Sequence, residues 1–394
     1  MWILPENKLL QYSGRIDLNS KDKHWKEINL ERIRCCMQAA EEGKELTIGF
    51  FGGSITQGSV ASDDTRSYAY RVFQWWERTY PRAVFHYVNG GIGGTSSHFG
   101  TARVVKNLLM YQPDFVVVDF SVNDFVNGDE KEGAFFQETY EGLLRRILSW
   151  PSKPAVLVLN NVFYDTGQNA QEYHNAVADY YGVPHVSIKD TIYQRILKGE
   201  YTREELTPDN LHPNDKGHGL VAGEICRFLE MVKQGAEGLA ERKTEKENQI
   251  VSKPLTANAY EQAKLLTIEN CNPVLEGFRA DASEKAGHLD FFKNGWIGKQ
   301  KGDRITFQTE CSCLAIQYRK TIQKPSPVAK VIVDGNRKQA VILDGNFEET
   351  WGDCLYLQTL LHHGEHKVHT VEVEIIEVSE EDRAPFYLLA LITA

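Results

Sequence analysis

Three polar residues in two distant segments of the chain could together activate a hydroxyl group. Ser54 lies in the glycine-rich segment GGSITQG (residues 52–58), and His212 lies in TPDNLHPND, three residues after Asp209. A serine hydroxyl is a weak nucleophile until a base takes its proton, and a carboxylate can orient the imidazole that serves as this base. These residue types therefore predict nucleophilic acyl transfer, provided that the fold brings the two segments together.

Ser54 also stands where an α/β fold would bind a ligand. The apolar run LTIGF (residues 46–50) predicts a buried strand that leads directly into the glycines around Ser54. Loops at the carboxyl ends of the strands border the ligand crevice of an open α/β sheet. A phosphate-binding loop is disfavoured because the lysine before its serine or threonine is missing. The alternative without chemistry is that Ser54 only caps the following helix.

Two further loops could supply donors for the oxyanion that develops during acyl transfer. NGGIGGTSS (residues 89–97) follows the second predicted strand, and SVND (residues 121–124) follows the third. Each polar residue has a plainer interpretation as well: Asn123 as a turn residue, His212 as an exposed loop residue, and Asp209 or Asp124 as an acid at a loop or helix start. For Asp124 we favour the structural role.

The segments that must position these residues alternate short apolar runs with helical periods. Amphipathic stripes between the runs predict helices near residues 68–76, 105–109, 173–180 and 220–229. Alternation of this kind is typical of parallel strands joined by crossover helices. The sequence thus predicts an α/β fold, a flavodoxin-like five-stranded parallel sheet, with strands at residues 46–50, 83–88, 115–120, 155–160 and 184–188.

Beyond the last of these helices the pattern changes. Residues 232–256 are charged and contain few large apolar side chains, which predicts a solvated helix or linker. Residues 257–394 then alternate apolar and polar side chains between turn signals, which predicts an antiparallel β-sandwich. We place a catalytic domain at residues 44–231 and an N-terminal extension at residues 1–43, which could pack on the β-sandwich.

The chemistry-bearing residues occur in the order and context of the SGNH hydrolases, the GDSL-like esterases. GGS around Ser54 is similar to the GDS block of that family, GGTSS resembles its second block at Gly94, SVND resembles its third block at Asn123, and Asp209 with His212 matches its terminal DxxH. By this resemblance Ser54 is the nucleophile, His212 the general base and acid, and Asp209 its orienting group. The resemblance also implies an oxyanion hole formed by the Ser54 N–H, the Gly94 N–H and the Asn123 side-chain amide.

Two positions depart from the family pattern. Gly53 stands where the family has Asp, and Ser121 stands where it often has Gly. Neither position carries a proton in the mechanism, so we expect altered loop packing and intact chemistry. The C-terminal stretch from residue 295 to 373 looks like the jelly-roll domain that accompanies some carbohydrate esterases. By that looser resemblance Trp296 or Trp351 could stack on a sugar ring, the alternative being that both belong to the core.

Composition limits the remaining choices. The formal net charge of −10 argues against nucleic acid as a partner, no run approaches a membrane span, and the first residues lack the pattern of an export signal. We therefore expect a cytoplasmic protein without a membrane partner, and its self-association into a homo-oligomer stays open. The seven cysteines lack zinc-site spacing, and the four histidines of LHHGEHKVH (residues 361–369) do not predict a metal site. No cofactor is expected.

These observations predict a serine esterase that removes acyl groups, most readily acetyl groups, from carbohydrate esters through an acyl-enzyme. One alternative keeps the chemistry and changes the acyl chain: a lipase-like or thioester hydrolase with a long apolar pocket. Another alternative, of a different class, is a non-catalytic saccharide-binding protein that has the same fold.

Overall fold

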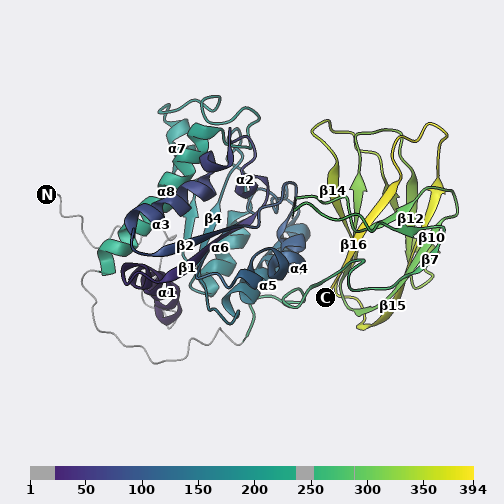
Figure 1. Cartoon of the computed structure of the whole chain (residues 1–394), viewed down its shortest axis with the longest axis horizontal. Coiled ribbons are helices and arrows are strands. Elements are labelled where there is room, and N and C mark those ends of the chain that lie inside the picture. Colours follow the sequence, from purple (N-terminus) through teal and green to yellow (C-terminus); the bar gives the residue numbers. More distant parts are fainter. Residues whose placement is uncertain (1–22, 237–252, 288) are drawn as a thin grey trace. The chain divides into compact units, whose positions relative to one another are not determined.

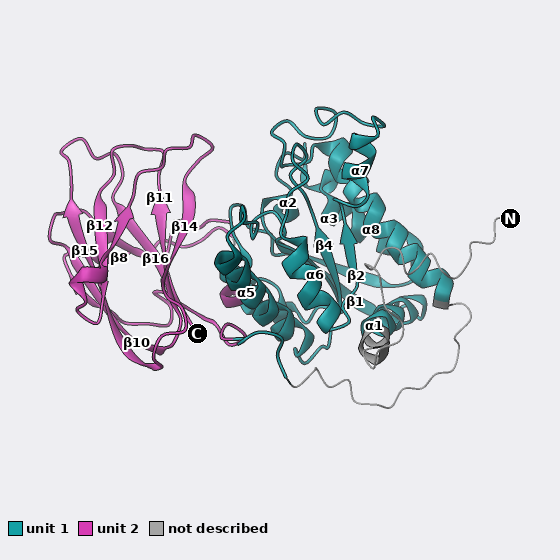
Figure 2. Ribbon diagram, turned by 180° about the vertical axis from the view of Figure 1, so that it is seen from behind, with its two compact units in different colours: residues 1–100, 104–258 teal, residues 101–103, 259–394 magenta. Residues whose placement is uncertain are grey.

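The computed structural model describes residues 23–236, 253–287 and 289–394. The chain divides into two compact units, residues 1–100 with 104–258 and residues 101–103 with 259–394 (Figure 2). Among the described residues, no helix is long and apolar enough to cross a membrane. All seven cysteines are unpaired.

The first unit is built on a five-stranded parallel sheet (Figure 1). Its spatial order, β2-β1-β3-β4-β5, is the flavodoxin-like order, so the predicted α/β fold is confirmed. The strands coincide closely with the five apolar runs of the sequence: β1 Glu45–Gly52, β2 Val84–Asn89, β3 Phe115–Asp119, β4 Ala155–Asn160 and β5 His185–Ser187.

Helices cover both faces of this sheet, which is why the central strands are apolar on consecutive residues. One face packs against α1 (Lys23–Glu41), α3 (Tyr68–Thr79) and α8 (Asp215–Ala236). The other face packs against α4 (Ser97–Asn107), α5 (Glu130–Leu148) and α6 (Gln171–Tyr180). Within β3 the side chains alternate between the two cores: Val117 points to the first and Val116 and Val118 to the second. Shorter helical segments are α2 (Ser54–Gln57), η2 (Asp64–Arg66), η3 (Leu109–Tyr111) and α7 (Ile192–Leu197).

The described part of the N-terminal extension belongs to the first unit. Ile33, Met37 and Ala40 of α1 are buried in the core beside α8 and the sheet. The extension could have packed on the β-sandwich; for its described residues, the apolar stripe of α1 instead completes one face of the parallel sheet. The rest of the extension, residues 1–22, lies outside the described residues. Helix α8 runs to Ala236 and buries Val232, so the helix continues beyond the expected boundary at residue 231.

The second unit consists of two antiparallel sheets that enclose one apolar core. One sheet has the order β13-β12-β15-β10-β7, and the other has the order β14-β11-β16-β9-β8, with β6 paired to β16. The predicted β-sandwich is thus confirmed. Its strands are β6 Lys264–Leu266, β7 Val274–Glu276, β8 Arg279–Ala280, β9 Trp296–Gly298, β10 Arg304–Cys311, β11 Leu314–Lys320, β12 Val328–Val333, β13 Val341–Asp344, β14 Cys354–Leu361, β15 Lys367–Glu377 and β16 Phe386–Thr393, with η4 at Arg337–Gln339.

Candidate active site

Strand β1 delivers Ser54 to the carboxyl edge of the parallel sheet. The strand ends at Gly52, and Ser54 is the first residue of the short helix α2. A Cβ at Gly52 would overlap the Asp119 carbonyl and the Thr56 hydroxyl, so the close approach of β1, β3 and α2 requires glycine there. The N-cap of α2 is Gly53, and the hydroxyl of Ser54 contacts His212 Nε2. The interpretation of Ser54 as a mere helix cap therefore fails.

The loop between α7 and α8 brings His212 to Ser54. The two residues are 158 positions apart in the chain, yet His212 Nε2 lies 2.8 Å from Ser54 Oγ. Asp209 shapes this loop because its Oδ1 accepts hydrogen bonds from the backbone N–H groups of Leu211, at 3.0 Å, and His212, at 2.7 Å. Its second oxygen, Oδ2, lies 2.6 Å from His212 Nδ1. The structure thus joins Ser54, His212 and Asp209 in one chain of hydrogen bonds.

The same contacts shift the pKa of Asp209. Partial burial opposes the ionisation of Asp209, but the hydrogen bonds from the His212 side chain and from the backbone of His212 and Leu211 outweigh it and lower the pKa of that carboxyl. Because a carboxylate only accepts, His212 donates its Nδ1–H to Asp209 and leaves the Nε2 lone pair facing the Ser54 hydroxyl. Ser54 is 7% exposed, so its hydroxyl is largely shielded from bulk water.

Three hydrogen-bond donors were predicted beside the serine. Gly94 adopts a φ of +67°, a left-handed conformation that favours glycine. Within the described part of the chain, the Ser54 N–H, the Gly94 N–H and the Asn123 side-chain amide have no hydrogen-bond partner. Three unused donors of this kind would suit a developing oxyanion, and the oxyanion hole stays a prediction.

Asn123 also explains the glycine at position 53. A Cβ added to Gly53 would overlap Oδ1 of Asn123 and would lie 3.0 Å from its Cγ. The carboxamide of Asn123 therefore occupies the space that a side chain at position 53 would need. This close packing accounts for the departure from the GDS pattern and places the Asn123 side chain directly against the residue before Ser54.

A buried carboxyl group that the sequence analysis did not single out lies behind this loop. Asp119, the last residue of β3, accepts hydrogen bonds from Thr56 Oγ1 at 3.2 Å and from Asn161 Nδ2 at 2.8 Å, and its carbonyl accepts from the Gly53 N–H at 3.3 Å. Burial raises the pKa of Asp119 from its ordinary value of 3.8 to about 7, although hydrogen bonds from Asn161 and Thr56 oppose this shift. The sequence signal that could have identified Asp119 is an acidic residue at the end of an otherwise apolar strand.

The two tryptophans predicted for sugar binding differ in their surroundings. Trp296 is 1% exposed and packs edge-on against Phe307 in the core of the second unit. Its prediction as a sugar contact is wrong because neither face of its ring is free. Trp351 is 59% exposed on the loop between β13 and β14, where its ring contacts Phe347 edge-on and its indole N–H donates to Glu349.

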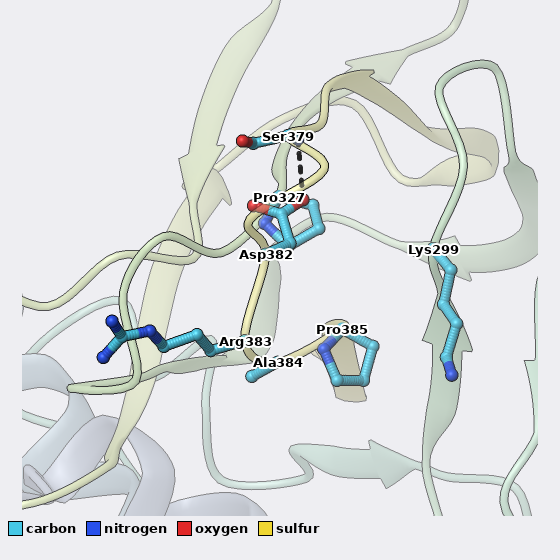
Figure 3. Close-up of a pocket in the computed structure, with 7 residues that line it drawn as sticks. All are labelled: Lys299, Pro327, Ser379, Asp382, Arg383, Ala384 and Pro385. Carbon is cyan, nitrogen blue, oxygen red and sulfur yellow. Dashed lines mark hydrogen bonds between the residues drawn. The ribbon is translucent and has the colours of Figure 1, made fainter.

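A buried histidine and a cavity in the second unit lie apart in the sequence from the predicted catalytic residues. His369 is buried and satisfied on both ring nitrogens, by Asp334 Oδ2 at 2.8 Å and by the Glu365 carbonyl at 3.0 Å, which fits a structural role. A cavity of about 230 Å³ lies beside the segment before β16 (Figure 3). It is lined by Lys299, Pro327, Ser379, Asp382, Arg383, Ala384 and Pro385, and neither tryptophan lines it.

Comparison with known proteins identifies the family of the chain. The chain belongs to the GDSL-like lipase/acylhydrolase family, whose model matches residues 50–220. It is similar over both units to a two-domain esterase, CEX, active on acetylated mannans and co-crystallized with mannopentaose: the identity is 47%, the TM-score is 0.86, and the match covers 92% of this chain and 94% of that one. A second crystal structure with the same description of the esterase gives the same identity and TM-score over 92% and 95% of the two chains. No curated protein sequence matches the chain significantly.

Proposed function

We propose that the protein is a serine esterase that removes acetyl groups from acetylated mannan oligosaccharides through an acyl-enzyme. The observation that carries this proposal is the contact chain from Ser54 Oγ to His212 Nε2 and from His212 Nδ1 to Asp209. It lies in a member of the GDSL-like lipase/acylhydrolase family that is 47% identical to an esterase active on acetylated mannans. The family supports the ester chemistry, and the relative supports the class of substrate.

Acylation begins at the serine hydroxyl. Ser54 Oγ attacks the carbonyl carbon of the ester while His212 Nε2 takes its proton, and Asp209 stabilises the imidazolium that forms. The carbonyl oxygen becomes an oxyanion and accepts hydrogen bonds from the Ser54 N–H, the Gly94 N–H and the Asn123 amide. When this intermediate collapses, the bond to the sugar oxygen breaks, and His212 returns the proton to the departing sugar hydroxyl. Acetyl remains bound to Ser54.

Deacylation repeats the same steps with water. His212 Nε2 takes a proton from a water molecule, whose oxygen attacks the acetyl carbonyl and regenerates the oxyanion. Collapse releases acetic acid, and His212 gives the proton back to Ser54 Oγ. The proposed cycle uses only water and the side chains and backbone of this chain; that no cofactor is needed stays a prediction.

The substrate class can be tested by acetate release. We expect the purified protein to release acetate from acetylated mannooligosaccharides with a kcat/KM at least about tenfold above that for acetylated xylooligosaccharides, and to hydrolyse p-nitrophenyl acetate faster than p-nitrophenyl octanoate. Preference for octanoate would favour the lipase-like alternative. Saccharide binding without acetate release would favour the non-catalytic alternative, and equal rates on all sugars would remove the mannan assignment.

Trp351 is our proposal for a sugar contact, since it offers an exposed ring in the unit whose core buries Trp296. Stacking of a sugar on an aromatic ring contributes modestly, so Trp351→Ala should raise the KM for acetylated mannooligosaccharides about two- to tenfold and leave p-nitrophenyl acetate hydrolysis unchanged. An unchanged KM for the oligosaccharides would rule out this contact.

The cytoplasmic location, the lack of nucleic-acid and membrane partners, and the formation of a homo-oligomer stay predictions.

A further inference from the structure

A second histidine and aspartate pair lies next to the predicted oxyanion hole and takes no part in the proposed mechanism. The side chains of Asp124 and His174 are both 0% exposed, and His174 Nε2 lies 3.0 Å from Asp124 Oδ2. The other carboxyl oxygen, Oδ1, accepts a hydrogen bond from the Ser97 backbone N–H at 2.8 Å. A buried carboxylate is costly unless its oxygens are satisfied, and both oxygens of Asp124 have a partner.

The two partners of Asp124 connect it to both oxyanion-hole loops. Asp124 directly follows Asn123, and the backbone N–H groups of both residues donate to the Phe120 carbonyl, at 2.9 and 3.0 Å, which folds this segment into a tight turn. Ser97 is the first residue of α4, three residues after Gly94. A carboxylate at the N-terminus of a helix is also favoured by the partial positive charge there. One carboxyl group therefore fastens the Asn123 loop to the Gly94 loop.

His174 is itself held firmly in place. Its ring stacks on the Tyr140 ring of α5, with 3.6 Å between the centroids and an interplanar angle of 6°. The N-cap residue of α6, the helix that carries His174, is joined to the Asn123 loop as well, since the Ala170 N–H donates to the Ser121 carbonyl at 2.7 Å. The loop that presents Asn123 is thus held from two sides, by α4 and by α6.

We propose that Asp124, held by His174, is a positioning residue for the oxyanion hole: it fixes the Asn123 amide and the Gly94 N–H relative to one another. This inference rests on the proposed function, since it assigns a role toward the same oxyanion. Loss of the carboxyl group would let the two loops separate, and displacement of a donor by about 1 Å can reduce the rate about a hundredfold. The substrate-binding residues would stay in place, so kcat should change and KM should not.

The experiment compares Asp124→Ala with a matched control, Glu141→Ala, using p-nitrophenyl acetate. Glu141 is also a fully buried carboxyl group of the first unit, and it accepts from the backbone N–H groups of Leu255 and Thr256. We expect Asp124→Ala to lower kcat about 10- to 100-fold with KM within about threefold. The control should lose melting temperature to a similar degree and keep its kcat within about twofold. Equal loss of kcat in both variants would reduce the role of Asp124 to general stability.

Two further measurements separate positioning from folding. Asp124→Asn keeps an oxygen for the Ser97 N–H and an amide that can donate to neutral His174, so it should recover most of the lost rate. In an Asn123→Ala background, Asp124→Ala should cost at least about fivefold less than in the wild type, because one of the two donors that it positions is already gone and only the Gly94 N–H remains. If Asp124→Ala does not fold, two variants of His174 are compared instead. His174→Phe keeps an aromatic ring and removes the N–H, so its kcat should fall. His174→Gln keeps a donor, so its kcat should not fall.

Ser54→Ala, measured in parallel, distinguishes failure of this inference from failure of the proposed function. If Ser54→Ala is inactive and folded Asp124→Ala retains a kcat within about threefold of the wild type, the positioning role is wrong and the esterase mechanism stands. Equal costs of Asp124→Ala with and without Asn123 would also overturn it. If Ser54→Ala retains its activity, the proposed function itself fails.

Discussion

At the scale of single residues, the site depends on close packing as much as on chemical groups. Ser54, His212 and Asp209 could be predicted from the sequence because their chemistry requires those residue types, and the structure places them in hydrogen-bond contact. Gly53 could not be interpreted in the same way. Its glycine is explained only by the carboxamide of Asn123, which fills the space beside it.

This packing leads to a prediction for Gly53→Ala. The new methyl group would displace the Asn123 carboxamide, so kcat for p-nitrophenyl acetate should fall roughly tenfold or more while the fold is kept. In an Asn123→Ala background, which should itself cost roughly 10²–10³ in kcat, the same change should have little further effect.

Gly223→Ala is the matched control for this substitution. Gly223 lies in α8, and a Cβ there would meet no atom within 4 Å, so the kcat of Gly223→Ala should equal that of the wild type. This explanation of Gly53 would be refuted if Gly53→Ala kept the full kcat. It would also be refuted if Gly53→Ala lowered kcat as much in the Asn123→Ala background as in the wild type.

At the scale of elements, the carboxyl ends of β1 and β3 hold the site through a network that is not itself part of the reaction. Asp119 at the end of β3 accepts from Thr56 of α2 and from Asn161 after β4, so it connects three neighbouring segments. Because the carboxyl group is buried, its pKa rises to about 7 in the folded protein, whereas in the unfolded chain it should stay near its ordinary value of 3.8.

The stability of the protein should depend on pH through Asp119. The folded state holds this proton up to about pH 7 and the unfolded state releases it near pH 4, so the stabilising contribution is complete at low pH and is lost as the pH rises through that window. Relative to Asp119→Asn, the free energy of unfolding of the wild type should fall by up to about 1.4 kcal/mol per pH unit between these values. Denaturant unfolding of both variants from pH 5 to pH 8 measures this; a difference that stays constant with pH would contradict it.

Elements with a clear apolar period were predictable, and those fixed by tertiary contacts were not. All five strands of the parallel sheet matched apolar runs, and in β3, β4 and β5, which are buried along their whole length, burial leaves little choice of side chain. Helix α5 was not predicted. The link between Asp124 and His174 also lay beyond the sequence, because 50 residues separate the pair and each residue alone has an ordinary interpretation. For Asp124 the structural role that we favoured agrees with its burial.

At the scale of the whole molecule, two separately built units carry different kinds of residue. The parallel sheet holds the predicted catalytic groups, and the β-sandwich holds the exposed Trp351. Sequence patterns predicted both architectures and left open which unit the N-terminal extension packs against, since an amphipathic helix does not indicate which core it completes; α1 is buried in the core of the first unit. The similarity to a two-domain esterase extends over both units, which favours a function that uses the entire chain.

Chemical labelling of the native protein with a serine-directed fluorophosphonate tests the central claim most directly, because only an activated serine reacts rapidly with this probe. Intact-protein mass spectrometry should show one adduct per chain, and peptide mapping should place it on Ser54. Ser54→Ala should take up no label, and His212→Ala should react far more slowly although its serine is still present. Absence of an adduct, an adduct on another serine, or labelling that is equally fast without His212 would contradict the assignment of Ser54 as a nucleophile activated by His212.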